Sequence, residues 1–171
     1  MTKSLLILND DAADRVRKEY GAYVKRLRKE VPDLVLVGGA VRDTLFNRPV
    51  KDLDFMTADG TARLRLQGSF RTPLRLCPGA RNPTYEHHTG NLVEVLETED
   101  RAANVLIVLD IVARVQEFPD TLSQVWFDGE HVHCLAGFAF ARDELYVETN
   151  ERMTPERLAR LKAKYPEFGF N

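Results

Sequence analysis

Two aspartates separated by one residue, Asp52 and Asp54, are the part of this sequence best suited to chemistry. In an extended chain alternate side chains share a face, so these two carboxylates point the same way while Leu53 points the other way. Two like charges on one face repel each other unless a cation lies between them. Oxygen ligands of this kind suit Mg²⁺, which also takes waters and substrate phosphates as ligands. The spacing therefore predicts a magnesium site that acts on phosphates.

A glycine pair precedes the aspartates and indicates an anion site. The apolar run 34–37 predicts a strand, and Gly38 and Gly39 allow a sharp turn from it into a helix. The free N–H groups and the dipole at the start of such a helix favour an anion. Arg42 follows in the first turn and adds a positive charge, and the break at 47–49 ends the helix before the two aspartates.

Taken together, residues 36–57 resemble the head-domain signature of the polymerase-β-like nucleotidyltransferases, in the branch of bacterial-type tRNA nucleotidyltransferases and poly(A) polymerases. That signature is written GGxVRDxLLGRxxxDxDxxT. The matching residues are Gly38, Gly39, Val41, Arg42, Asp43, Leu45, Arg48, Asp52, Asp54 and Thr57, and the departures are Phe46 and Asn47. A DxD pair alone is common on protein surfaces, but its combination with GGxVRD at this separation is specific.

The resemblance implies an α/β fold, a mixed β-sheet flanked by helices, and transfer of a nucleotide from an NTP to an acceptor hydroxyl with release of pyrophosphate. It implies two Mg²⁺ ions held by Asp52 and Asp54, which activate the hydroxyl and neutralise the leaving group. Gly38 and Gly39 would meet the triphosphate, and Arg42 would add a charged contact to it. We expect an RNA acceptor, such as a tRNA-like 3′ end. There are two alternatives. Either the chain transfers the nucleotide to a protein or small molecule, or it is a nucleotide-binding module without catalytic activity.

Two further charged residues of the same segment belong to the expected nucleotide-binding set. We expect Asp43 to orient the helix or Arg42 rather than to touch a metal ion. Lys51 either screens the triphosphate or is solvated, and the sequence does not favour one of these roles over the other.

The third carboxylate of this superfamily lies on a neighbouring strand, and the sequence leaves three positions open for it. Residues 92–98 resemble the strand that carries this glutamate, which makes Glu94 our first choice as the third catalytic and metal-binding acid. A second register places the neutral Asn104, in the apolar strand 104–109, at the same position. Asp110, at the end of that strand, is the third possibility.

The chain departs from full tRNA nucleotidyltransferases in the segments that read the nucleotide. Their Arg-Arg-Asp motif has only Phe118-Pro119-Asp120 as an analogue, which keeps the aspartate and loses both arginines. Their EDxxR motif is missing, because Ala103 stands where the arginine should follow Glu99-Asp100. The sequence also has no room for the helical neck, body and tail that hold tRNA. These departures predict a minimal, stand-alone nucleotidyltransferase and argue against templated CCA addition.

Composition fits a single compact domain over residues 1–171, with 44% hydrophobic and 29% charged residues. The 24 Lys and Arg residues are nearly balanced by 26 Asp and Glu residues, so any RNA contact must come from local basic patches. The candidates are the basic helix faces within 15–29 and 157–164. Cys77 and Cys134 form neither a CxxC pair nor a disulfide framework. With no apolar run long enough for a membrane span and no signal peptide, we expect a cytoplasmic protein.

Hydrophobic periodicity, caps and turn residues predict the elements that must position these groups. Helical spacing of apolar residues, an Asp-Gly turn and a Thr-Pro helix start are the strongest of these signals. The predicted elements are a helix over 11–31, strands over 34–37, 92–96 and 104–109, a hairpin over 125–134, a last helix that begins at Thr154-Pro155, and an ordered loop over 73–83.

Overall fold

The computed structural model describes residues 5–77 and 91–171 of the chain. The strands of its main sheet are β1 (Leu5–Leu8), β2 (Val35–Val37), β3 (Leu53–Thr57), β4 (Leu74–Leu76), β5 (Leu92–Thr98), β6 (Ala103–Val108), β7 (Val125–Phe127) and β8 (Val132–Leu135). The helices are α1 (Asp11–Glu30), α2 (Gly39–Leu45), α3 (Ala62–Arg65), α5 (Ile111–Gln116), the 3₁₀ turn η2 (Thr121–Ser123), α6 (Ala136–Glu144) and α7 (Pro155–Lys164). A small second sheet pairs β9 (Tyr146–Val147) with β10 (Gly169–Phe170).

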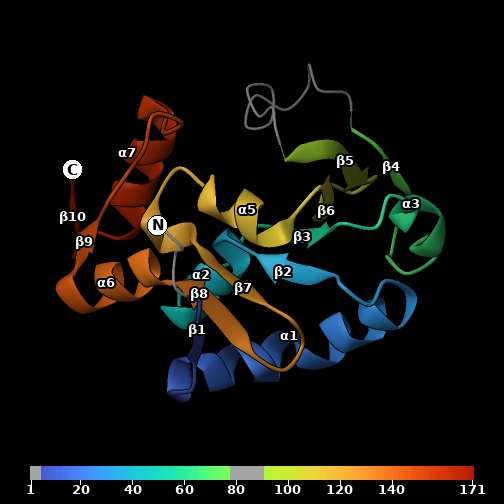
Figure 1. Ribbon diagram of the computed structural model, residues 1–171, viewed down its shortest axis with the longest axis horizontal. Coiled ribbons are helices and arrows are strands. Elements are labelled where there is room, and N and C mark those ends of the chain that lie inside the picture. Colours follow the sequence, from blue (N-terminus) through green and yellow to red (C-terminus); the bar gives the residue numbers. More distant parts are fainter. Residues whose placement is uncertain (1–4, 78–90) are drawn as a thin grey trace.

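The eight strands form one mixed sheet in the order β1-β8-β7-β2-β3-β6-β5-β4. β3 and β6 run parallel, and the other neighbouring pairs run antiparallel. Helices lie on both sides of the sheet, with α1 along one side and α5 on the other (Figure 1). This arrangement confirms the predicted mixed sheet flanked by helices.

The two faces of the sheet bury different sets of side chains. On one face Leu36 and Phe55 pack with the apolar stripe of α1, which includes Val16 and Leu27, in the larger core cluster. On the other face Val37 packs with residues of α5 and neighbouring strands in a smaller cluster. Successive residues of β2 therefore serve opposite cores, as the period of two in a strand requires. All three residues of β2 are buried, which fits its place inside the sheet.

Helix α1 matches the predicted helix in position and in its signals. The side chain of Asp10 caps its first turn by accepting a hydrogen bond from the backbone N–H of Ala13 at 3.0 Å. Acidic residues lie in the first turn and basic residues in the last, which complements the helix dipole. The hairpin and the last helix are confirmed too: β7 and β8 pair antiparallel, Gly129 takes a φ of +97°, and the Thr154 side chain caps α7.

The predicted loop over 73–83 is wrong for its first part, because Leu74–Leu76 form β4 and pair antiparallel with β5 at the sheet edge. A three-residue edge strand is too short to show an alternating pattern, so the sequence gives little signal for it. Residues 78–83 of that prediction lie outside the described residues. Within the described residues, no helix combines the length and the apolarity that crossing a membrane requires.

Candidate active site

The glycine pair forms the predicted turn between β2 and α2. Gly38 has a φ of +62°, a conformation that side chains other than glycine adopt at a cost, and its N–H donates to the carbonyl oxygen of Val125 at 3.0 Å. A Cβ atom at Gly38 would also meet the ring of Phe118 at 3.6 Å. The turn therefore brings the backbone of Gly38 and Gly39 to the edge of a pocket that both residues line.

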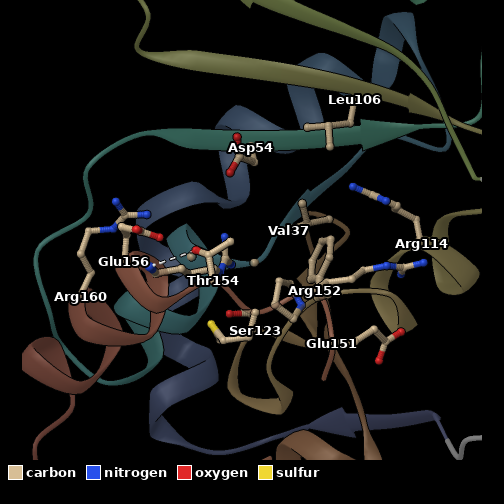
Figure 2. Close-up of a pocket in the computed structure, with 16 residues that line it drawn as sticks. Val37, Asp54, Leu106, Arg114, Ser123, Glu151, Arg152, Thr154, Glu156 and Arg160 are labelled. Carbon is tan, nitrogen blue, oxygen red and sulfur yellow. Dashed lines mark hydrogen bonds between the residues drawn. The ribbon is translucent and has the colours of Figure 1, made fainter. Parts of the chain in front are cut away.

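Asp54 lines the same pocket from the neighbouring strand. It lies opposite Val37 in the antiparallel pair of β2 and β3, so its side chain shares the face of the smaller core cluster. Asp52 is half-buried and immediately precedes β3, outside the residues that line the pocket. Figure 2 shows Asp54 and Leu106 on the same side of their strands, with Val37 near them. The structure thus brings Asp54 and the glycine turn together.

The neighbour of Asp54 on the other side is Asn104. The parallel register of β3 and β6 pairs these two residues directly, and Nδ2 of Asn104 donates to Oδ1 of Asp54 at 3.0 Å. Asn104 is 7% exposed, and its Oδ1 atom is buried without a hydrogen-bond partner in the structure. The amide of Asn104 therefore lies beside Asp54, at the position that the second possible strand register in the sequence gave to this residue.

Glu94 is not brought to this position. It lies on β5, which is separated from β3 by β6, and it pairs with Ile107, whose side chain packs in the larger cluster on the α1 side. Side chains of directly paired residues share a face, so Glu94 points to the side of the sheet opposite Asp54. Its predicted role as the third acid stays a prediction, and its position gives that role no support. The physical reason is the strand register, which places Asn104 rather than Glu94 beside Asp54.

The remaining predicted residues fall into two groups. Asp110, the third possibility, caps α5 by accepting from the backbone N–H of Ala113 at 2.8 Å, which is a structural role away from Asp54. Lys51 is exposed and does not line the pocket. Arg42 and Asp43 are buried in α2 and belong to a polar network next to the pocket.

This network holds α2 to the C-terminal helix. Nε of Arg42 donates to Asp43 at 2.8 Å, the hydroxyl of Tyr165 donates to Asp43 at 2.6 Å, and Nζ of Lys164 forms an ion pair with the other carboxylate oxygen. Burial alone lowers the pKa of the Arg42 guanidinium, but the charge and the hydrogen bond of Asp43 outweigh burial, so this pKa lies above its ordinary value. Burial also raises the pKa of Tyr165, which keeps its hydroxyl protonated as a donor. These contacts agree with the orienting role expected for Asp43.

A second branch of the network reaches the segment that replaces the Arg-Arg-Asp motif. Nη1 of Arg42 donates to the hydroxyl of Ser123 at 2.8 Å, and that hydroxyl donates to Asp120 at 3.0 Å. Asp120 is 1% exposed, and Arg157 of α7 lies 3.9 Å from its carboxylate. Phe118 and Pro119, which stand in place of the two arginines, line the pocket instead. The guanidinium of Arg42 therefore serves this network, and Arg42 itself is not among the pocket-lining residues.

Arginines from three other segments supply the positive charge of the pocket. The pocket has a volume of about 680 Å³, within the usual range for small-molecule sites. Its arginines are Arg114 of α5, Arg152 of the turn that precedes α7, and Arg157 and Arg160 of α7. Figure 2 shows Arg114 and Arg152 on one side of the space below Asp54 and Arg160 on the other. Glu151 and Glu156 line the pocket as well, and the four guanidinium groups suit phosphates, which arginine binds in a bidentate manner.

Sequence reasoning pointed to only part of this arginine set. The basic face within 157–164 was a candidate patch, and it does line the pocket through Arg157 and Arg160. Arg114 and Arg152 were missed, because only the tertiary fold brings them together. The one available signal was the position of Arg114 inside the apolar run 111–115, where a charge needs a buried partner. It finds one in Glu117, at 3.0 Å.

The donor set fits a hard divalent cation such as Mg²⁺. Carboxylate oxygens of Asp52 and Asp54 are the ligand type that Mg²⁺ prefers, and the buried amide oxygen of Asn104 has no hydrogen-bond partner among residues 5–77 and 91–171. Among the residues that the structure describes, no group of three or more His, Cys, Asp or Glu side chains is placed to hold a metal ion. The site therefore has fewer acidic ligands than the resemblance implies.

Comparison with known proteins agrees with this geometry. Residues 34–100 match the family described as the poly A polymerase head domain. The CCA-adding enzyme of Buchnera aphidicola is 50% identical over 38 residues, which span 22% of this chain and 9% of that enzyme. The Thermotoga maritima CCA-adding enzyme complexed with tRNA has a TM-score of 0.65 at 14% identity, over 100% of this chain and 43% of that one. The Bacillus stearothermophilus CCA-adding enzyme in complex with CTP has a TM-score of 0.56 at 15% identity, over 95% of this chain and 42% of that one.

The chain therefore shares the fold of the first part of these CCA-adding enzymes, and its segment 34–100 matches a nucleotidyltransferase head-domain model, in line with the resemblance. Within that class, the particular family to which residues 34–100 are similar is that of the poly A polymerase head domains. The chain spans less than half of the length of the solved relatives and a smaller share of the curated one.

Proposed function

We propose that this chain transfers a nucleotide from an NTP to an acceptor hydroxyl in a divalent-metal-dependent reaction, with an RNA 3′ end as the acceptor. One observation carries the proposal: Asp54, the glycine turn and the four arginines line the same pocket of about 680 Å³. A carboxylate that suits a metal ion and a set of cations that suits phosphates are the two things that such a reaction needs in one place.

The reaction is one displacement at phosphorus. The acceptor oxygen forms a bond to the α-phosphorus of the NTP, the bond from that phosphorus to the bridging oxygen of the β-phosphate breaks, pyrophosphate leaves, and the hydroxyl proton passes to water. Asp52 and Asp54 would hold Mg²⁺, which when bound supplies Lewis-acid stabilisation of the attacking and leaving oxygens. The chain itself binds the triphosphate through the glycine turn and the arginines, and Asp54 marks the end of the pocket where the α-phosphate belongs.

Three of the four pocket arginines are held in place by carboxylates of the chain. Glu117 is already shared by Arg114, at 3.0 Å, and Arg152, at 3.7 Å, and Arg157 lies 3.9 Å from Asp120. These ion pairs fix the guanidinium groups before a ligand binds, which lowers the entropy lost on binding. The arginine side of the pocket is therefore preorganised for an anionic ligand.

An RNA acceptor is supported by the position of α7 and by the relatives. α7 carries Arg157 and Arg160 into the pocket wall and continues with Lys162, so cations extend away from the site along one helix. Lys164 is held by Asp43 and does not count among them. The relatives with this fold are CCA-adding enzymes, and one of them is complexed with tRNA. Helix α1, by contrast, packs against the sheet face opposite Asp54, and its basic residues lie behind the site.

The experiment is transfer of labelled nucleotide. The protein is incubated with each α-labelled NTP, Mg²⁺ and total RNA, and product length is read on a gel. Asp54→Asn should abolish transfer, because it removes a charged metal ligand, while its thermal stability without metal should match or exceed that of the wild type. Asp110→Asn is the matched control, because it makes the same substitution at a residue whose capping role an asparagine retains.

Three results would contradict the proposal. If Asp54→Asn still transfers nucleotide, the mechanism in which Asp54 holds the metal ion is wrong. If the label appears in protein or in a small molecule but never in RNA, the acceptor is not RNA. If no NTP is consumed with any acceptor while NTP still binds, the chain is a non-catalytic nucleotide-binding module.

A further inference from the structure

The residue beside Asp54 determines how much negative charge the metal site can offer. Asn104 takes this position through the direct pairing of β3 and β6, and the two side chains are joined by a hydrogen bond of 3.0 Å. The amide orientation is set by this contact, because the flipped amide would place its oxygen against a carboxylate oxygen. The amide oxygen is then left buried and without a partner.

A neutral amide changes the electrostatics of the site in two ways. Its N–H group stabilises the charge of Asp54 where a third carboxylate would repel it, so there is less repulsion for a cation to offset. Its oxygen is a weaker ligand for Mg²⁺ than a carboxylate, because it carries no net charge. Two carboxylates balance the charge of one divalent cation and leave a second cation uncompensated.

We infer that Asn104 limits this site to one resident divalent cation, held by Asp52 and Asp54, with Asn104 acting as the positioning residue that fixes the carboxylate of Asp54. The inference rests on the proposed function for the identity of the site. It differs from the scheme implied by the resemblance, in which the carboxylates hold two ions. Asn104 is thus the residue that separates this chain from a three-carboxylate site.

The test is the number of Mn²⁺ ions bound by the full chain without NTP, measured by isothermal titration calorimetry and by the electron paramagnetic resonance signal of free Mn²⁺. The wild type should bind one ion in this site, and Asp54→Asn should remove it. Asn104→Asp should bind a second ion, or bind the first about tenfold more tightly, because it adds a charged ligand. Without metal this variant should melt at a lower temperature than the wild type, and Mn²⁺ should restore the loss, because a cation relieves the new repulsion with Asp54.

Asn91→Asp is the matched control. Nδ2 of Asn91 donates to a carboxylate oxygen of Glu117 at 3.0 Å, so this substitution also places an acid beside an acid, but away from Asp54. It should leave the number of bound Mn²⁺ ions and their affinity unchanged. A change in the Mn²⁺ count or affinity of Asn91→Asp as well would show that the added charge acts without regard to its position beside Asp54.

The outcomes separate the inference from the proposed function. Two ions bound by the wild type, or an Asn104→Asp variant that folds and binds Mn²⁺ no differently, overturn the inference while transfer activity stands. If Asn104→Asp fails to fold, the inference is still tested by the number of Mn²⁺ ions that the wild type binds and by the loss of that binding in Asp54→Asn. If the wild type binds no Mn²⁺ at this site and also transfers no nucleotide, both the inference and the proposed function fail.

Discussion

The side chain of Glu94 points to the face of the sheet opposite Asp54, because it pairs with Ile107 rather than with Asn104. We therefore expect Glu94→Gln to leave the rate of nucleotide transfer within about twofold of the wild type, as for a substitution outside the site. Single-turnover kinetics of this variant beside Asp54→Asn provide the measurement. A loss of several orders of magnitude in Glu94→Gln would instead restore it as the third acid.

For single residues, the sequence predicts contacts within one short segment. It does not predict contacts that depend on how two distant strands are aligned. The glycine turn and Asp54 could be predicted because the motif that carries them lies within 22 consecutive residues, 36–57. The contact between Asp54 and Asn104 joins residues 50 positions apart, so its register depends on packing that no short motif records. The same holds for Arg114 and Arg152, which only the tertiary fold brings to one pocket.

At the scale of elements, Asp43 connects α2 with the end of α7. Asp43→Asn should lower the free energy of unfolding by about 3 kcal/mol, because it leaves the buried Arg42 and the nearby Lys164 without their shared counterion. It should also weaken NTP binding, because α7 carries pocket arginines, while Mn²⁺ binding at Asp54 persists. Urea denaturation and equilibrium binding of a labelled NTP check the two effects.

Glu167→Gln is the control for this prediction. Glu167 forms an exposed ion pair with Arg48, and such pairs contribute about 1 kcal/mol or less. Equal losses of stability in the two variants would show that the contacts of Asp43 contribute no more than an exposed ion pair does. They would contradict the role of Asp43 in holding α7 to α2.

The elements with strong end signals were predictable, and those without were not. α1 and α7 have capping side chains, Asp10 and Thr154, and apolar stripes at helical spacing. α6 begins at Ala136 after Leu135, which provides no side-chain cap, and it is followed by Leu145 in a left-handed conformation, so neither end is marked in the sequence. The two-residue strands β9 and β10 are likewise too short for a pattern.

At the scale of the whole molecule, the sheet separates a face with the site from a face without it. RNA binding should therefore depend on α7 and not on α1, although both helices are basic. Arg160→Gln should lower the slope of log affinity against log salt for single-stranded RNA by about 0.7, the value for one lost phosphate contact. Lys25→Gln, an exposed position on α1, should leave the slope unchanged. Equal effects of the two substitutions would mean that RNA is held without regard to the site.

The parallel pairing of β3 with β6 has a consequence for the order in which the molecule folds. β5 and β6 are close in the chain and can pair as a local unit, whereas β3 must close a long segment before it reaches β6. We expect the backbone amides that join β3 to β6 to gain protection from hydrogen exchange later than those of the β7–β8 hairpin, which pulse labelling during refolding can measure. Earlier protection of β3 would contradict this order. A chain still emerging from the ribosome would then have Asp52 and Asp54, the aspartates that we propose to bind a metal ion, without the Asn104 amide that holds Asp54. The site would form only after β6 pairs with β3.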